Sequence, residues 1–381
     1  MKKIIFSPIN SLFTAAALLA CSAPVFAELP TFPLNDEFTT STNETVSVTD
    51  WTPNVINSTG VWNIVGDMAQ VNWYYEGWYR DFLRGEGTIN LGSDTQGGVL
   101  YIMGSNPVTE EVYNLWFDFA GTINVERKGQ FTLGGSYNSR YGTIFSIGTL
   151  NINGGAVSVM SETANSSYFR IKNLTVRDDG KLESALSLTT ASGGTWNLHS
   201  AGGVVSSLLR VSSGTFTLNL LGENALSELP RLSFDENTGT NFRINVSANN
   251  SIETLELNGN ATLGLYVTDG ATLKIENLAS KSNAQSLTDV TFVFYDYSAD
   301  SVLFGVSDPW IEDNRLYIPS IGTFVNLVAY DGEGNLLQGE WVYDWNGETG
   351  KLVLNAVPEP AAVAAVLGAL ALAFAARRRR K

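Results

Sequence analysis

Cysteine and histidine are almost absent from this 381-residue chain, which contains one of each, Cys21 and His199. Cys21 lies in an apolar leader, so the chain beyond it has no disulfide, no cysteine nucleophile and no cysteine-ligated zinc. A single histidine excludes a His-based triad or a multi-histidine metal site within one chain, and we expect His199 to be a surface residue next to Leu198. The sequence therefore predicts no catalytic residues, no metal ion and no cofactor.

Basic residues are also scarce, with 23 Lys and Arg against 38 Asp and Glu. The leader and the basic terminus carry seven of the 23, so the remainder has 16 basic and 38 acidic residues and a formal net charge of −22. Such an acidic surface favours solubility and repels nucleic acid and anionic membranes. We expect no nucleic-acid partner; the binding of divalent cations is the alternative use of this charge.

The first 27 residues have the pattern of a secretory signal peptide. Lys2 and Lys3 supply a positive start, residues 12–19 form an apolar core, and small residues precede the expected cleavage between Ala27 and Glu28. An alternative is a lipoprotein signal in which Cys21 is acylated. In both cases the sequence predicts export.

The C-terminal residues form three successive parts. A short proline-containing motif is followed by an apolar stretch, residues 361–376, and by a basic end. The motif consists of Val357, Pro358, Glu359 and Pro360, and the basic end of Arg377, Arg378, Arg379, Arg380 and Lys381. The apolar stretch is expected to form one transmembrane helix, and the positive charge keeps the basic end in the cytoplasm and places the body on the far side.

These three parts, in this order, resemble the PEP-CTERM sorting signal of bacteria that have an outer membrane. The resemblance covers only the tail. It implies transient anchoring in the inner membrane, recognition by an exosortase-like sorting enzyme, and delivery of the body to the cell surface and its exopolysaccharide. The alternative is a plain tail anchor that stays in the membrane.

A phrase of the form Gly-Thr-x-Asn recurs in the body, at residues 87–90, 121–124, 148–151, 194–197 and, stretched, at 214–219. We interpret the glycine as a turn residue that precedes a strand. Apolar residues then alternate with polar ones, as in Leu150/Ile152, Leu174/Val176 and Trp196/Leu198. No helical pattern intervenes, and repeated Asn and Thr residues are expected to form ladders inside the coils or along the turns.

These repeats predict an all-β fold, a right-handed parallel β-helix or solenoid with β caps, and a β-sandwich or stacked β domains as the alternative. The last strands are expected to include a hairpin, residues 324–330 with 340–343. The predicted divisions of the chain are a signal peptide (1–27), an aromatic-rich N-terminal β cap (28–86), solenoid repeats (87–288), a C-terminal β cap (289–355) and the sorting tail (356–381).

An aromatic cluster at residues 51–82 is the candidate ligand site. Exposed Trp and Tyr rings stack on sugars, and the candidates are Trp73, Tyr75, Trp78 and Tyr79. The alternative is that the same rings are buried in the core of a cap.

Two acidic segments have features of a catalytic or calcium-binding site. Asp178 and Asp179 have the adjacency of paired carboxylates in some β-helix glycosidases, but they precede Gly180, which favours a turn. Residues 331–335 place oxygens at alternate positions, as a calcium loop does, but Leu336 stands where the turning glycine is needed.

The combined pattern predicts an exported, non-enzymatic cell-surface or extracellular-matrix protein associated with exopolysaccharide or biofilm. Two alternatives stay open. One is a carbohydrate-active β-helix enzyme, a polysaccharide lyase or hydrolase, and the other is a sugar-binding adhesin.

Overall fold

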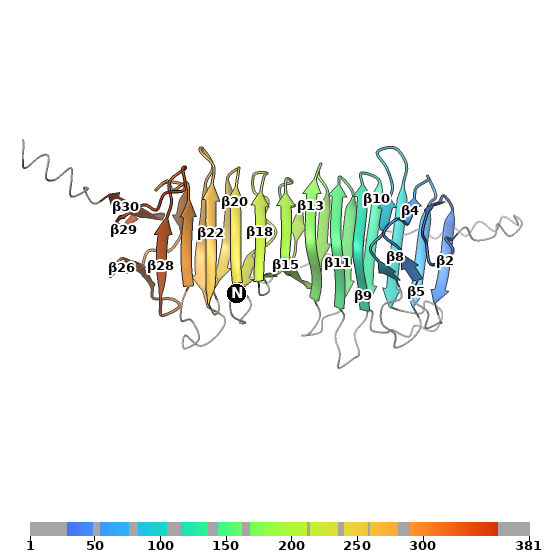
Figure 1. Ribbon diagram of the computed structural model, residues 1–381, viewed down its shortest axis with the longest axis horizontal. Helices are drawn as coiled ribbons and strands as arrows, with labels where there is room; N and C mark the ends of the chain where they lie inside the picture. Colours follow the sequence, from blue (N-terminus) through green and yellow to red (C-terminus); the bar gives the residue numbers. More distant parts are fainter. Residues whose placement is uncertain are drawn as a thin grey trace, which may run out of the picture.

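The computed structural model describes residues 29–48, 54–75, 83–104, 116–135, 144–161, 168–211, 214–234, 240–257, 260–280 and 290–356. Over these ranges the chain consists of strands joined by turns, and the strands lie side by side along an elongated rod (Figure 1). Neighbouring strands are parallel from β1 to β24. The fold is a parallel β-solenoid, which confirms the predicted fold class.

The coils of the solenoid contribute strands to three faces. The first face contains β3 (Asn54–Ile56), β6 (Leu83–Gly85), β17 (Leu209–Val211) and β19 (Arg231–Phe234). The second contains β1 (Glu37–Thr40), β4 (Val61–Ile64), β7 (Thr88–Leu91), β18 (Gly214–Leu220), β20 (Thr240–Val246), β22 (Ala261–Val267), β24 (Val290–Tyr295) and β28 (Thr323–Ala329). The third contains β2 (Asn43–Val48), β5 (Gln70–Tyr75), β8 (Gly98–Gly104), β10 (Gly129–Gly135), β12 (Ala156–Ser161), β14 (Lys181–Ser184), β16 (Val204–Val205) and β25 (Val302–Phe304).

Longer strands bend at a corner and serve two faces. β9 (Trp116–Glu126), β11 (Ile144–Asn153), β13 (Tyr168–Arg177) and β15 (Ser187–Leu198) pass from the first face to the second. β21 (Asn250–Glu256) and β23 (Leu273–Ala279) pass from the third face to the first. Register shifts mark the corner, as between Ile147 and Thr149.

The core runs along the inside of the rod as columns of apolar side chains, one from each coil. The inward column of the second face consists of Trp62, Ile89, Ile123, Leu150, Leu174, Trp196, Leu218, Ile244, Leu265 and Phe294, all buried. Because strand residues alternate between the two sides of a sheet, the intervening polar residues face outward. Each coil is thus stabilised by its two neighbours, as in other repeat structures.

The recurring glycines lie at the corner between faces. Gly121, Gly148 and Gly194 are inside β9, β11 and β15, so the predicted turn before a new strand is a bend within one strand. A Cβ at Gly148 would overlap the carbonyl oxygen of Ala120, on the preceding coil. Glycine is required here because adjacent backbones approach closely at the corner.

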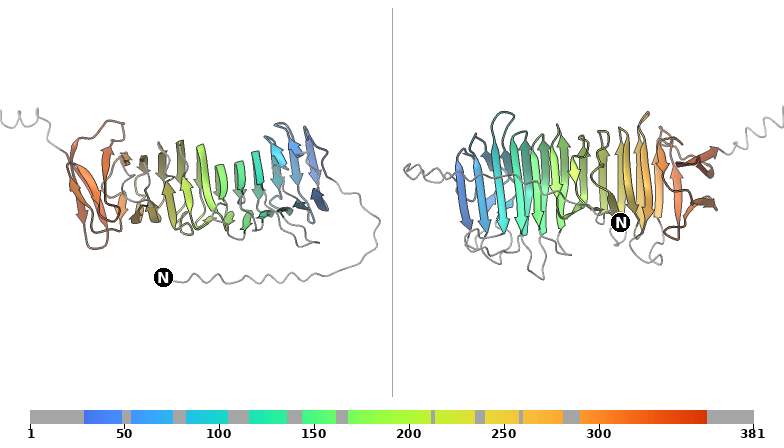
Figure 2. Two further views of the ribbon diagram at one scale, coloured as in Figure 1. Left: turned by 90° about the horizontal axis from the view of Figure 1, so that it is seen from below. Right: turned by 180° about the vertical axis from the view of Figure 1, so that it is seen from behind.

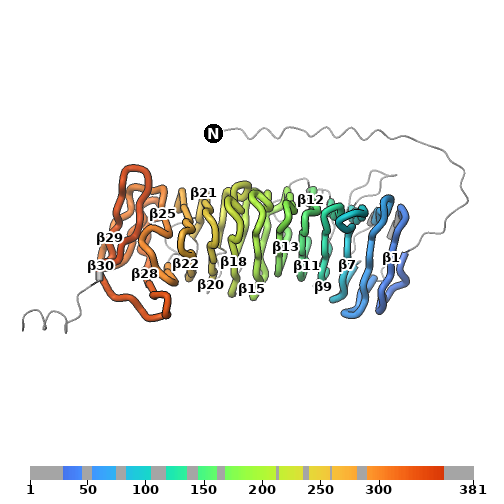
Figure 3. The backbone as a smooth tube through the Cα atoms, turned by 90° about the horizontal axis from the view of Figure 1, so that it is seen from above, coloured from blue at the N-terminus to red at the C-terminus, as the bar shows by residue number. Residues whose placement is uncertain are grey.

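The N-terminal region, expected to form a separate cap, consists of coils in the described part of residues 28–86. β4 and β5 pair in parallel with β7 and β8, and β3 pairs with β6. Figure 3 shows β1 at one end of the rod, in line with the later strands. The first coils therefore continue directly into the repeats.

The C-terminal end changes from parallel to antiparallel pairing. β26 (Trp310–Glu312), β27 (Arg315–Ile318) and β28 form an antiparallel series, and β29 (Gly339–Trp345) pairs with β30 (Gly350–Ala356). These strands cover the last coil at the end opposite β1 (Figure 2). They form the β cap expected at this end.

The prediction of a hairpin between residues 324–330 and 340–343 was wrong. β28 pairs with β24 on one side, and on the other side β27 pairs with its first four residues, Thr323–Asn326. β29 pairs with β30 instead, and only an isolated bridge joins Tyr330 to Leu336.

The predicted C-terminal helix lies outside the described residues, as does the signal peptide. Within the described ranges, no helix is long and apolar enough to cross a membrane. The structure therefore describes the body between the two terminal segments.

Candidate functional site

The predicted sugar-stacking cluster is represented in the described residues by Trp73. Its side chain is 2% exposed, and its ring lies 5.8 Å from Trp62 and 6.1 Å from Phe32, measured between ring centroids. Trp73 is therefore a core residue and not a stacking surface, because β5 turns it inward. The side chains of Tyr75, Trp78 and Tyr79 lie outside the described part of the chain.

The other candidate catalytic residues in the repeats lie on the surface or in turns. His199 is exposed directly after β15. Asp178 and Asp179 are exposed, have φ values of 56° and 63°, and join β13 to β14. Left-handed backbone of this kind is tolerated by Asp and is typical of turns, which confirms the turn interpretation of this pair.

The segment at residues 331–335 is an Asx turn. Asp331 Oδ1 accepts hydrogen bonds from the backbone N–H groups of Glu333 (3.0 Å) and Asn335 (2.7 Å), and Asn335 Nδ2 donates to Asp331 Oδ2 (3.0 Å). These hydrogen bonds, chiefly from Asn335, lower the pKa of Asp331. Among the residues that the structure describes, no group of three or more His, Cys, Asp or Glu side chains is placed to hold a metal ion.

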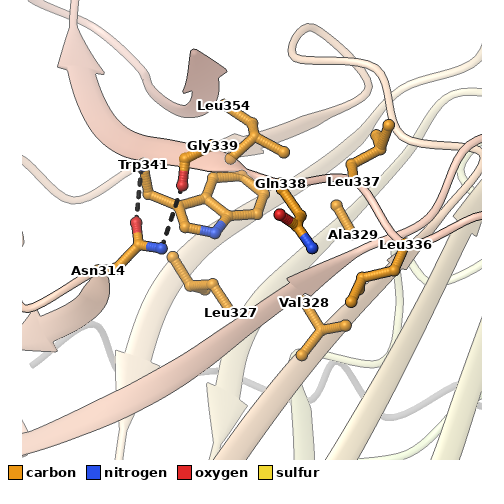
Figure 4. Close-up of a pocket in the computed structure, with 10 residues that line it drawn as sticks. All are labelled: Asn314, Leu327, Val328, Ala329, Leu336, Leu337, Gln338, Gly339, Trp341 and Leu354. Carbon is orange, nitrogen blue, oxygen red and sulfur yellow. Dashed lines mark hydrogen bonds between the residues drawn. The ribbon is translucent and has the colours of Figure 1, made fainter. Parts of the chain in front are cut away.

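A cavity of about 500 Å³ opens between β28 and β29 in the C-terminal cap (Figure 4). It is lined by Asn314, Leu327, Val328, Ala329, Leu336, Leu337, Gln338, Gly339, Trp341 and Leu354. Asn314 closes one side, because its Nδ2 donates to Gly339 O (3.2 Å) and its Oδ1 accepts from Trp341 N (2.8 Å). The lining carries no charged side chain, and the amide of Asn314 is engaged in holding β29.

The outward side chains of the second face, from β4 to β28, form a surface that we call the ladder face. Its main column contains asparagines that hydrogen-bond from coil to coil. Asn90 Nδ2 donates to Asn63 Oδ1 (2.7 Å), Asn124 Nδ2 to Asn90 Oδ1 (2.7 Å), and Asn151 Nδ2 to Asn124 Oδ1 (2.8 Å). Successive members lie 27, 34 and 27 residues apart in the chain. The recurring asparagine of the sequence is thus a ladder on the outer surface.

The asparagine column is interrupted once. Thr175 occupies the position between Asn151 and Asn197. The ladder then resumes, with Asn219 Nδ2 donating to Asn197 Oδ1 (2.7 Å) and Asn245 Nδ2 to Asn219 Oδ1 (2.7 Å). A parallel column beside it carries the threonines of the phrase, among them Thr122, Thr149, Thr195 and Thr217. This part of the ladder face consists mostly of amides and hydroxyls, and charged side chains enter it at Glu126, Arg177 and Arg243.

Beyond Asn245 the same column becomes aromatic. Tyr266 and Tyr295 follow in register, and the ring of Tyr330 stacks on Tyr295 with centroids 5.7 Å apart and planes 12° from parallel. The guanidinium of Arg243 lies 4.8 Å from the centroid of Tyr295 and 5.8 Å from that of Tyr266. The three tyrosines are partly exposed. The ladder face therefore ends in rings rather than amides.

The same sheet continues across β28, β27 and β26, where three further rings form what we call the aromatic strip: Trp310, Tyr317 and Phe324. Trp310 lies opposite Tyr317 and Tyr317 opposite Phe324 in the antiparallel register. Their centroids are 4.3 Å and 4.8 Å apart. Trp310 is 46% exposed, and the other two rings are partly exposed.

Polar side chains accompany the strip two residues along each strand, on the same face of the sheet. Glu312 lies opposite Arg315, and Arg315 opposite Asn326. The guanidinium of Arg315 lies 4.5 Å from the ring centroid of Phe324, and Trp310 Nε1 donates to Glu312 Oε2 (3.4 Å). Hydrogen-bonding groups therefore lie beside the rings on the same face.

The aromatic strip was not predicted from the sequence, although the sequence contains one signal for it. Asp313 and Asn314 have φ values of 48° and 60°, as the two central residues of a type I′ hairpin turn require. Asp-Asn between the alternating segments 310–312 and 315–318 could have been read as a tight hairpin. That reading would have placed Trp310 and Tyr317 on one face.

The sorting and cleavage residues lie outside the described ranges. This applies to Ala27 and Glu28 at the N-terminus, to the motif at residues 357–360, and to the basic residues 377–381. These assignments remain predictions from the sequence.

Comparison with known proteins gives no match to a family model, to a curated protein sequence or to a solved structure. The ladder face and the aromatic strip are the two features with a distinct chemistry.

Proposed function

We propose that this chain is an exported, non-enzymatic protein of the cell surface or extracellular matrix, associated with exopolysaccharide. Its tail engages an exosortase-like sorting enzyme and anchors the chain transiently in the inner membrane before release. The observation that carries the proposal for the body is the ladder face, a hydrogen-bonding surface rich in amides and hydroxyls that extends along the rod from Asn63 to Asn245.

The build of the ladder face suits a structural role. Within the two runs Asn63 to Asn151 and Asn197 to Asn245, each asparagine amide is bonded to the amide of the neighbouring coil, so the surface supports the stacking of the coils. An amide in such a column keeps hydrogen-bonding capacity toward its surroundings, because it has two donors and two lone pairs. A rod of this kind offers many equal, weak contacts to a hydrated polymer, and their combined effect is retention by avidity.

A sugar-binding role within this proposal is favoured by the rings at the C-terminal end. Tyr266, Tyr295 and Tyr330 are partly exposed on the ladder face, and Trp310 is 46% exposed on the neighbouring strip. Exposed aromatic rings provide apolar faces on which sugar rings pack. A polysaccharide lyase or hydrolase would in addition need converging carboxylates for proton transfer.

Fractionation of the host cells tests the sorting part of the proposal. The full chain is compared with a chain that ends at Ala356 and with a chain carrying Pro358→Ala, Glu359→Ala and Pro360→Ala. Sorting predicts that the full chain reaches the surface or matrix fraction, that the truncated chain does not, and that the triple variant stays in the inner membrane.

The triple variant separates sorting from simple anchoring, because it keeps the apolar stretch and the basic end. A plain tail anchor predicts the same membrane fraction for the wild type and the variant. Delivery of the truncated chain to the surface in wild-type amounts would refute the sorting proposal. Release of sugar fragments from a polysaccharide by the purified chain would refute the non-enzymatic part.

A further inference from the structure

We infer that the aromatic strip, Trp310, Tyr317 and Phe324, is a binding site for a neutral, linear polysaccharide. This inference rests on the proposed function and specifies its partner. Two of its rings, Trp310 and Tyr317, lie on the antiparallel strands β26 and β27 of the C-terminal cap, and Phe324 lies on β28, which joins the cap to the second face.

The rings are held as one platform by backbone pairing. β26 and β27 are joined by a tight turn, and β27 pairs with β28, so the three rings are cross-strand neighbours in one row. The centroids are 4.3 Å and 4.8 Å apart and the ring planes are tilted by 39° and 55°, so the three rings touch one another in a row without lying in one plane. Leu316 and Ile318, which alternate with Tyr317, are fully buried and fix β27 against the core. The platform is therefore prearranged and costs little conformational entropy on binding.

Sugar rings with mainly equatorial hydroxyls have apolar C–H faces and polar edges. The faces pack on aromatic rings, and the hydroxyls need donors and acceptors at the side. Glu312, Arg315 and Asn326 form a second row directly beside the rings. They provide a carboxylate, a guanidinium and an amide, which bond neutral hydroxyl groups in either direction. The strip thus has both parts that a sugar-binding surface requires.

The direction of the strip favours a linear polymer. The row of rings crosses the strands, as the asparagine column and its tyrosine continuation do. Strands are about 4.8 Å apart, which is close to the advance of an extended chain by one sugar unit. An extended polysaccharide lying across the strands therefore meets a similar set of groups at each step.

The charge favours a neutral ligand. The chain between its terminal signals has 16 basic against 37 acidic residues, and Glu312 and Asp313 lie at the strip itself. A surface of this sign repels anionic polysaccharides and anionic lipid headgroups. A neutral glucan, mannan or xylan meets no such repulsion.

The test uses the full-length chain in detergent solution and isothermal titration calorimetry. The probes are cellohexaose, mannohexaose and xylohexaose, an alginate hexasaccharide, and vesicles of phosphatidylglycerol and phosphatidylethanolamine. The variants are Trp310→Ala, Tyr317→Ala and the conservative Trp310→Phe. The matched control is Val342→Ala, which changes a side chain of similar exposure (43%) on β29 of the same cap. Circular dichroism checks that each variant is folded.

We expect at least one neutral hexasaccharide to bind the wild type, Trp310→Ala and Tyr317→Ala to weaken binding about tenfold, and Trp310→Phe to retain part of it. The control should stay within about twofold of the wild type. Unchanged binding by folded Trp310→Ala overturns the inference but leaves the proposed function standing, because the sugar then binds elsewhere on the body. Binding of alginate or vesicles alone, no binding of any neutral probe, or a dimer that Trp310→Ala dissociates also overturns the inference. The sorting experiment is independent of these outcomes.

Discussion

The two ends of the ladder face have the same backbone and different chemistry. From Asn63 to Asn245 the outward column carries amides that bond to each other, whereas from Tyr266 to Tyr330 the same column carries aromatic rings. Parallel pairing places one residue of each coil in the column in both regions. The strand register therefore sets the position of a side chain. The chemistry of that side chain determines whether it hydrogen-bonds to the next coil or is available to a partner.

This difference arises because an amide can form hydrogen bonds within the protein, whereas the face of an aromatic ring cannot. An asparagine in the column uses one donor and one acceptor within the protein, so the ladder stabilises the coils that it joins. An aromatic ring at the surface has a face that no hydrogen bond can satisfy, and burial of that face by a ligand is favourable. We therefore expect changes in the amide region to affect stability, and changes in the aromatic region to affect binding.

The largest expected effect distinguishes an inward ring from an outward one. Trp196 is fully buried below the amide column, its Nε1 donates to Ile171 O (3.2 Å), and its ring meets Phe216 edge to face. Trp196→Ala should lower the free energy of unfolding by about 3–5 kcal/mol. Trp310→Ala, at an exposed ring, should lower it by less than about 1 kcal/mol. Urea denaturation of both variants measures the difference, and equal losses would contradict the assignment of the two rings.

The next effect concerns the corner that carries the ladder phrase. In Gly148→Ala the added methyl group meets the backbone oxygen of Ala120, so coil stacking must shift, and the unfolding free energy should fall by about 1–3 kcal/mol. Gly97→Ala is the control, because a Cβ there finds only ordinary contacts and the residue has no left-handed backbone. Its unfolding free energy should change by less than about 1 kcal/mol. Similar melting temperatures for the two variants would contradict the close approach at the corner.

Particular residues show why the sequence predicted the solenoid but not the strip. Leu150, Ile152, Trp196 and Leu198 alternate locally, and this local period was enough to predict that they are buried, as they are. The corner at Gly148 was predicted as a turn, because the sequence does not reveal that an adjacent coil lies against the glycine.

The ligand site was harder to predict because it depends on pairing between strands. Trp73 was a candidate for an exposed ring, but its orientation depends on the stacking of β5 between β2 and β8, and it is buried. Trp310 and Phe324 become neighbours of Tyr317 only when β27 pairs on both sides. The sequence shows where aromatic residues occur along the chain, whereas the pairing of strands determines which of them share a surface.

A smaller effect is expected from the amide ladder itself. Asn124→Ala removes a hydrogen bond to Asn90 and one from Asn151, at partly buried positions, and should lower the unfolding free energy by about 1–2 kcal/mol. Thr175→Asn fills the gap between Asn151 and Asn197 and should raise it by up to about 1 kcal/mol. Guanidinium denaturation measures both. A loss of stability in Thr175→Asn would show that the column does not tolerate an uninterrupted ladder.

The smallest effect is a local dependence on pH, which the amide ladder lacks because its side chains do not titrate. Asp331 is a titrating counterpart in the cap, and hydrogen bonds from Asn335 hold its folded-state pKa below the ordinary value of 3.8. A depressed pKa means that the contribution of the carboxylate is complete above the unfolded pKa and is lost as the pH falls through the folded one. Between pH 5 and pH 2 we therefore expect faster hydrogen exchange at the N–H groups of Glu333 and Asn335, after correction for the intrinsic rate, and no such change at the ladder strands.

Asp331→Asn should abolish the pH dependence of the turn while leaving the thermal midpoint at pH 7 nearly unchanged, because the turn is exposed. Equal acid-induced changes in the turn and in β9 would mean that the acid response is global, and that the cap and the ladder do not differ in this respect.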